Sequence, residues 1–367
     1  MDVDLESVEI VFAQKLACGE PPVRAQALRE LHKWIQKQSK AKAFSDEDLT
    51  RLCKGLHYVM WMQDKMLMQE ELADKIAGLL EIFSSDDERA RYVKCFLLSL
   101  NKEWEHIDKW RMDKFLMSIR RIVRVSFHHL ARKNWNEKAV QLFWDEAFGK
   151  SVFSLDTFVR DFLIFHFASL FLDELDLAGG INEEQINGLL KNFINFLGQK
   201  ITDYVFNSVV DEVFNTMLHA KSEEVAGGEE GEDVEMKEGI KFDYKSIGRM
   251  LFDVGKRPET TSKRRVKLYD LAKRFEKAAD GKDPFEVQEL SFIPDVTKGQ
   301  VNEATKMANT FPSFSIADAV PSEKKFKGEG KKSKGKKGKK GGQVSGGKVA
   351  KRKSTTPNKK KKSQKGQ

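Results

Sequence analysis

The stretch RMDKFLMSIRRIVRVSFHHLAR, residues 111–132, decides the fold class of this chain. At 100° per residue, one side of a helix here is apolar and carries Phe115, Leu116, Ile119, Ile122, Val123, Phe127 and Leu130. The opposite side carries Lys114, Arg120, Arg121, Arg124, His128 and Arg132. The pattern predicts a long amphipathic helix with a buried face and a basic stripe.

Two interpretations of this basic stripe are open. Charged stripes on helices are usually solvated, and their cations can pair with carboxylates of neighbouring helices. The functional interpretation is contact with RNA phosphates or with an acidic protein surface, since arginine and lysine provide most phosphate contacts. The six residues are therefore the candidate binding face of this chain.

The rest of the first 220 residues shows the same helical period. Pro21 and Pro22 suit a first helical turn, Ser45 with Asp48 resembles a capping box, and Asp64 can cap a third helix. Further helices are predicted at 86–106, 108–132, 136–148, 155–177, 183–197 and 202–219. No segment alternates with the period of a strand. We expect an all-α fold, either a stacked-helix array of the HEAT or armadillo kind or an irregular helical bundle.

Composition divides the chain into four segments. Residues 1–220 form the helical domain, and 221–240 are acidic, rich in Gly and predicted to be a disordered loop. Residues 241–320 are predicted to be a helical and irregular extension that docks on the domain or on partners. Residues 321–367 hold 19 Lys and Arg against 2 Glu, a net charge of +17, which leaves −9 for residues 1–320. This Lys-rich tail is expected to be disordered.

Several protein classes are disfavoured by composition. Only 8 Pro occur among 367 residues, which suits a helical protein. Cys18, Cys53 and Cys95 form no CxxC pair, so neither a disulfide framework nor a zinc site is expected. The longest apolar run, residues 162–172, is too short to span a bilayer, and the acidic N-terminus lacks a signal-peptide core. We expect no membrane contact.

Two separated segments resemble the eukaryotic ribosomal RNA processing protein 1 family. They are LCKGLHYVMWMQDKMLMQEELADKI, residues 52–76, and EWEHIDKWRMDKFLMSIRR, residues 103–121. Tryptophans, charged pairs and their spacing agree in both segments, whereas Cys53 and Met66 stand where the family pattern has Trp and Pro. Together with VRAQALRELHKWI near the N-terminus, the resemblance covers about residues 5–220 of the chain.

The resemblance implies a nuclear, nucleolar factor that processes pre-rRNA and matures the large ribosomal subunit without a catalytic motif of its own. The implied partners are pre-rRNA of the large subunit, large-subunit ribosomal proteins and other assembly factors. No cofactor, metal or small-molecule substrate is expected. The basic stripe would then contact rRNA or an acidic ribosomal protein.

Surface candidates outside the stripe are one tryptophan and the tail. Trp61 and Trp104 fit core positions, whereas Trp110, between Lys109 and Arg111, is the candidate surface aromatic. The tail residues Lys351, Arg352, Lys353, Lys359, Lys360, Lys361 and Lys362 resemble a two-cluster signal for import receptors. The same residues would bind RNA without base selectivity.

Two other functions compete with the assembly factor. The net-negative body could make the chain a nuclear helical-repeat adaptor for histones or other basic proteins. A carboxylate-based endonuclease would need acids such as Asp108 and Asp113 to meet others in space, although capping or ion pairing explains both. No hydrolase, kinase or metalloprotease motif is present in the sequence, so the chain is not predicted to be an enzyme.

Overall fold

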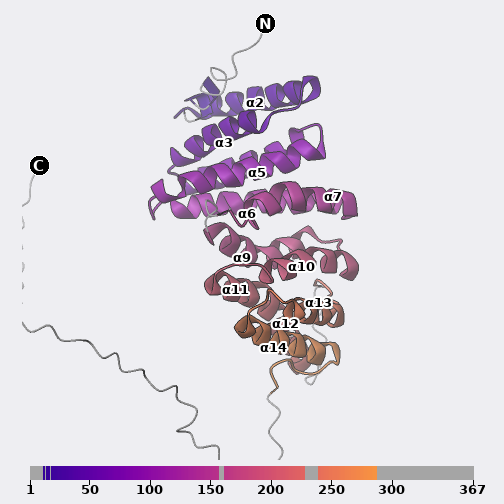
Figure 1. Cartoon of the computed structure of the whole chain (residues 1–367). Coiled ribbons are helices and arrows are strands. Elements are labelled where there is room, and N and C mark those ends of the chain that lie inside the picture. Colours follow the sequence, from indigo (N-terminus) through magenta and orange to yellow (C-terminus); the bar gives the residue numbers. More distant parts are fainter. Residues whose placement is uncertain (1–10, 13, 17, 157–160, 228–238, 287–367) are drawn as a thin grey trace, which may run out of the picture. The chain divides into compact units, whose positions relative to one another are not determined.

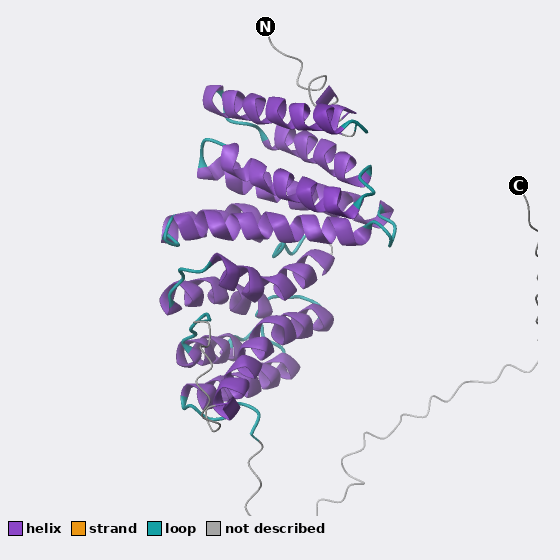
Figure 2. Cartoon of the chain, turned by 180° about the vertical axis from the view of Figure 1, so that it is seen from behind, coloured by secondary structure: helices purple, strands orange, loops and turns teal. Residues whose placement is uncertain are grey.

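Helices make up all the regular structure in the described part of this computed structural model, which comprises residues 11–12, 14–16, 18–156, 161–227 and 239–286. No strand occurs in those ranges (Figure 2). The predicted all-α class is confirmed. The sequence candidates in the tail, from Lys351 to Lys362, lie outside the described residues.

The chain runs through its helices in the following order. The first group is α2 (Pro21–Ala41), α3 (Asp46–Trp61), α4 (Met66–Gly78), the 3₁₀ turn η1 (Leu79–Ile82), α5 (Asp86–Glu103), the 3₁₀ turn η2 (Trp104–His106) and α6 (Met112–Arg132). The second group is α7 (Glu137–Leu142), the π-helix η3 (Phe143–Phe148), α8 (Gly149–Ser151), α9 (Asp161–Ala178), α10 (Glu183–Leu197), α11 (Asp203–Val209), the π-helix η4 (Val210–Asn215), α12 (Thr216–Gly227), α13 (Tyr244–Lys256) and α14 (Ser262–Ala279).

These helices stack in sequence order. Helix α3 packs on α5, α4 on α6, α6 on α9, and α10 on α13, so that each helix contacts neighbours close to it in the chain (Figure 1). All the described residues fall within one compact unit. The predicted stacked-helix array is confirmed, and the segment after the acidic region joins it because α13 packs on α10 and α14 packs on α12.

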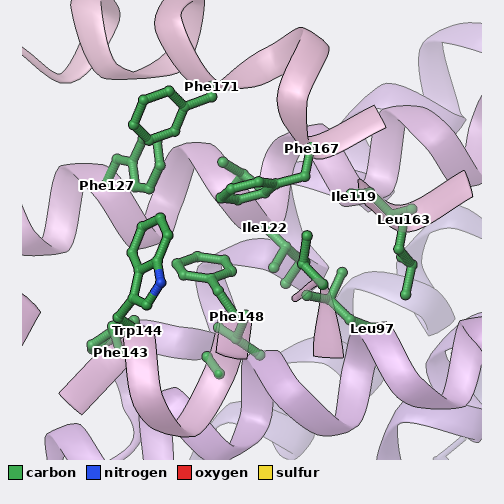
Figure 3. Packing of buried hydrophobic residues seen from close by; sticks show 14 of the residues in the cluster. Leu97, Ile119, Ile122, Phe127, Phe143, Trp144, Phe148, Leu163, Phe167 and Phe171 are labelled. Atoms are coloured by element: carbon green, nitrogen blue, oxygen red, sulfur yellow. The ribbon is translucent and has the colours of Figure 1, made fainter. Parts of the chain in front are cut away.

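An aromatic core joins α6, η3 and α9. Phe127 of α6 lies between Phe148 and Phe171, with ring centroids 6.2 and 5.9 Å apart respectively (Figure 3). Trp144 contacts Phe148 and Phe167 in the same cluster. Phe127 is fully buried, and replacing such a ring by alanine typically costs about 3–5 kcal/mol. This core fixes α6, the helix that carries the predicted basic stripe.

Local signals predicted some helix ends and missed others. Ser45 and Asp48 do form the capping box of α3. Asp64, in contrast, caps nothing, because α4 begins after Lys65 and has no side-chain cap. The helix predicted from Asp108 starts at Met112 instead, and residues 108–111 form a turn. Helix α12 continues to Gly227, so residues 221–227 are helical and not part of a loop.

Candidate functional site

The arginines of the predicted basic stripe are held by carboxylates of other helices. Arg124 Nε and Nη2 donate to the two carboxylate oxygens of Glu174 at 2.7 and 2.9 Å, and Arg120 Nε donates to the same group. Glu174, on α9, is fully buried. Two guanidinium groups of α6 thus share one carboxylate and join α6 to α9.

Electrostatics in this cluster favour the charged pair. Burial alone would raise the pKa of Glu174, but hydrogen bonds from Arg124 and Arg120 outweigh it and bring the pKa below its usual value. The same hydrogen bond raises the pKa of Arg124. Breaking a buried pair on one side leaves an uncompensated charge and costs about 3–5 kcal/mol. The cluster therefore stabilises the array.

The other members of the stripe are also placed against the protein. Arg121 Nε lies 2.9 Å from Asp74 Oδ1 of α4, and Arg132 pairs with Glu81 of η1. His128 is partly buried and has no ion pair among the described residues. The arginines of the stripe thus follow the first interpretation, in which the cations pair with carboxylates of neighbouring helices. Contact of the stripe with rRNA stays a prediction, and it would compete with these pairs.

Lys114 corrects one geometric expectation. The helical wheel put it on the solvent side, but it is only 6% exposed. Its Nζ donates to the carbonyl oxygens of Trp61 and Gln63, at 2.8 Å each. These groups lie at the C-terminal end of α3, where a helix leaves carbonyls without partners. Lys114 is thus a cap for another helix, and burial lowers its pKa.

The turn before α6 presents the predicted surface tryptophan. Trp110 is 83% exposed, and Lys109 Nζ lies 4.8 Å from its ring centroid. Asp108 Oδ1 accepts hydrogen bonds from the backbone N–H groups of Trp110 and Arg111 at 3.0 and 3.2 Å, which shapes the turn. Arg111 extends over the ring of Trp61 at 4.7 Å. Asp108, which the endonuclease hypothesis invoked, therefore has a structural role.

An apolar cleft of about 340 Å³ lies beside this turn. Its lining comes from α3, the end of α5, η2 and α6 and comprises Lys54, His57, Tyr58, Trp61, Met62, Leu100, Glu103, His106, Ile107 and Phe115. Tyr58 and Met62 are each 51% exposed at its edge. Both segments that carry the family resemblance thus meet at one concave apolar surface, which is the usual form of a binding site.

His57 gives this cleft one buried polar group. Ser99 Oγ donates to the Phe96 carbonyl and lies 3.4 Å from His57 Nδ1, so the hydroxyl accepts from Nδ1–H. Nε2 is then an unprotonated acceptor, and it is buried without a partner among the described residues. Burial lowers the pKa of His57 to about 3, which keeps the ring neutral. Sequence reasoning missed this residue because a lone histidine on an apolar face carries no spacing signal.

The described residues offer neither a metal-binding cluster nor a membrane-spanning helix. Within residues 11–286, leaving out the undescribed gaps, no group of three or more His, Cys, Asp or Glu is placed to hold a metal ion. In the same part of the chain, no helix has the length and apolar character that a membrane crossing requires. Cys18, Cys53 and Cys95 form no disulfide bond with one another.

Comparison with known proteins gives consistent matches. A family model described as "Nucleolar protein, Nop52" matches residues 7–272. A Caenorhabditis elegans protein named ribosomal RNA processing protein 1 homolog is 50% identical over 316 residues, which cover 85% of this chain and 79% of the relative. The human homolog A is 27% identical over 74% of this chain and 71% of its own length. The human homolog B is 37% identical over 48% of this chain but only 23% of its own length.

Proposed function

Because this chain belongs to the ribosomal RNA processing protein 1 family, we propose that it is a non-catalytic assembly factor for precursors of the large ribosomal subunit. The family predicted from residues 52–76 and 103–121 is confirmed, and the nucleolar description of the family agrees with the predicted nuclear and nucleolar localisation. The chain has a role in rRNA processing and ribosome biogenesis. Its large-subunit specificity and its scaffolding role belong to the proposal.

The apolar cleft beside η2 is the observation that carries this proposal. An assembly factor works by holding proteins and rRNA together, and such contacts centre on buried apolar anchors. An apolar side chain of a ribosomal or assembly protein would find a surface here. Met62 and Tyr58 are exposed at the edge of the cleft, and Trp110 is exposed in the turn before α6. These apolar and aromatic side chains are suited to binding a partner protein.

The acids considered for an endonuclease support the same conclusion. Asp108 shapes the turn that carries Trp110, and its side chain pairs with Arg111. Asp113 lies in the first turn of α6, where a carboxylate favours the helix dipole. Purified protein with Mg²⁺ should leave pre-rRNA intact. If the protein cleaved pre-rRNA and the Asp113→Asn variant did not, the chain would be an endonuclease and the scaffold proposal would be wrong.

The test of the scaffold uses the full chain with Met62→Glu. A carboxylate at the edge of the cleft should weaken a desolvated apolar contact, so the variant should leave large-subunit precursors in sedimentation gradients. Leu177→Glu is the matched control, because Leu177 is 53% exposed on α9, away from the cleft lining. Unchanged sedimentation of the Met62→Glu variant would contradict a docking role for the cleft.

The adaptor for histones or other basic proteins remains the competing proposal. It relies on the net charge of −9 over residues 1–320. Recovery of histones, with no large-subunit protein or rRNA, from purifications of the full chain after nuclease treatment would favour the adaptor. Under either function, the tail clusters Lys351–Lys353 and Lys359–Lys362 are proposed to bind import receptors.

A further inference from the structure

Helix α13 carries a row of exposed cations interrupted by an aromatic ring. Lys245, Arg249, Phe252 and Lys256 follow one another at intervals of four, three and four residues, which places them on one side of the helix. All four are exposed, and Phe252 is 41% accessible to solvent. Lys256 Nζ lies 4.3 Å from the centroid of the Phe252 ring.

Helix α14 extends this row into a wider face. Tyr269 packs beside Phe252 with ring centroids 4.8 Å apart, and exposed Lys273 lies one turn beyond Tyr269. The two helices approach closely because Gly255 lies between them. A Cβ atom at residue 255 would be 2.7 Å from Tyr269 Cε1. We call Lys245, Arg249, Phe252, Lys256, Tyr269 and Lys273 the α13–α14 face.

Three of the four cations of this face differ from the arginines of α6, because no carboxylate of the described residues pairs with them. Within the described ranges, Lys245, Arg249 and Lys273 form no ion pair. Lys256 lies 3.5 Å from Asp253, and both side chains are more than half exposed, so their interaction is weak. On α6, by contrast, Arg120 and Arg124 share the buried Glu174. A polyanion would have to displace Glu174 there, whereas it meets unpaired charge on the α13–α14 face.

The surrounding segment is strongly basic. Residues 241–282 contain 13 Lys and Arg and 6 Asp and Glu, a net charge of +7, although residues 1–320 as a whole carry −9. Such a local reversal of sign attracts polyanions to one part of the surface. The stripe from Lys245 to Lys256 spans about 16 Å, at 1.5 Å per helical residue. That length suits contact with several successive phosphates.

We propose that the α13–α14 face binds single-stranded RNA, with its ammonium and guanidinium groups on the phosphates and a base stacked on Phe252. This inference rests on the proposed function and names the surface through which that function reaches rRNA. An exposed ring between cations fits a nucleotide better than an acidic peptide, because stacking adds about 1–3 kcal/mol per base. Helix α2 supplies the comparison: Lys33, Lys37 and Lys40 are exposed and, among the described residues, form no ion pair. The aromatic residue between them in the sequence, Trp34, packs against Phe12 and Phe44 instead of lying in the row of cations.

Two charge-matched variants of the full chain test the surface. One carries Lys245→Gln, Arg249→Gln and Lys273→Gln, and the other carries Lys33→Gln, Lys37→Gln and Lys40→Gln. Affinity for a mixed-sequence single-stranded RNA is measured at several salt concentrations. The α13–α14 variant should lower the salt slope by about 2 units, ~0.7 per lost phosphate contact, and Phe252→Ala should weaken binding at every salt concentration. Equal losses in the two charge variants would reduce the effect to general electrostatics and overturn the proposal.

Mapping the RNA-bound peptides locates the contact directly. The intact protein is crosslinked to RNA by ultraviolet light in cells, and the modified peptides are identified by mass spectrometry. Adducts within residues 245–256 and 266–273 are the expected result. Adducts to rRNA that are confined to other segments overturn this inference alone, as does attachment of these lysines only to an acidic protein. A chain that crosslinks to no rRNA overturns this inference and the proposed function together.

Discussion

The ammonium nitrogen of Lys114 on α6 lies 2.8 Å from the carbonyl oxygen of Trp61 at the end of α3. A second hydrogen bond of the same length reaches Gln63. One buried cation thus fixes the turn between α3 and α4, next to the cleft formed by Tyr58, Trp61 and Met62. The two segments that carry the family resemblance are joined through this contact.

Lys114→Met should destabilise the chain by about 2 kcal/mol, because two partly buried carbonyl groups lose a charged donor. Urea unfolding followed by circular dichroism measures the change. Lys109→Met is the matched control, since exposed Lys109 lies over Trp110, and it should change stability by less than about 0.5 kcal/mol. Equal stability of the two variants would show that the Lys114 cap contributes nothing.

Glu174→Gln should cost about 3 kcal/mol, since it removes the carboxylate that Arg120 and Arg124 share in a buried site. Asp173→Asn changes the neighbouring carboxylate, which is 65% exposed and lies 3.3 Å from Arg120, so about 0.5 kcal/mol or less is expected. Thermal unfolding of both variants compares the two acids. A larger loss for Asp173→Asn would contradict the assignment of Glu174 as the joint between α6 and α9.

The triple change Arg120→Glu, Arg121→Glu and Arg124→Glu tests what the α6 stripe does. It places three carboxylates against Glu174 and Asp74, so we expect a lower melting temperature and a loss of helicity at 37 °C. Far-ultraviolet circular dichroism gives the result. Intact helicity combined with loss of precursor binding would instead make the stripe an intermolecular face, as the functional interpretation of the sequence proposed.

His57 should make stability depend on pH. Its pKa falls from 6.5 to about 3 on folding because of burial, so between these values the unfolded chain binds a proton that the folded chain does not. His57 therefore costs no stability above pH 6.5, and below that pH it lowers the free energy of unfolding by about 1.4 kcal/mol per pH unit. His57→Phe should remove that slope, measured by urea unfolding at pH 7, 6 and 5. His32 and the half-buried His166, whose pKa values desolvation also lowers, would leave a residual slope. An unchanged slope in the variant would contradict the buried neutral ring.

Helical periodicity predicted the fold because each apolar stripe here faces a neighbouring helix. The residues from Glu183 to Leu197, for instance, form α10 with the predicted ends. Local patterns failed in two places. Lys114 is buried because the end of α3, distant in the sequence, lies beside it, and Asp64 does not cap α4 because that helix begins one residue later, after Lys65.

The candidate site was harder to predict than the fold. A helical wheel shows which residues share a side, but it does not show that Glu174, 50 residues further on, meets Arg124. For the same reason the sequence did not distinguish the paired arginines of α6 from Lys245 and Arg249 of α13, which form no ion pair within the described part of the chain. The spacing of Lys245, Arg249, Phe252 and Lys256 was visible in the sequence, and the signal that would have singled it out was the local surplus of positive charge around it.

The most direct test of the central claim is crosslinking of the intact protein to RNA in cells, followed by sequencing of the bound fragments. A placed assembly factor predicts enrichment at defined positions in large-subunit rRNA and its adjacent spacers. Diffuse crosslinks spread over unrelated RNAs would contradict the account and leave a helical array whose basic segments bind RNA without a defined place in the precursor.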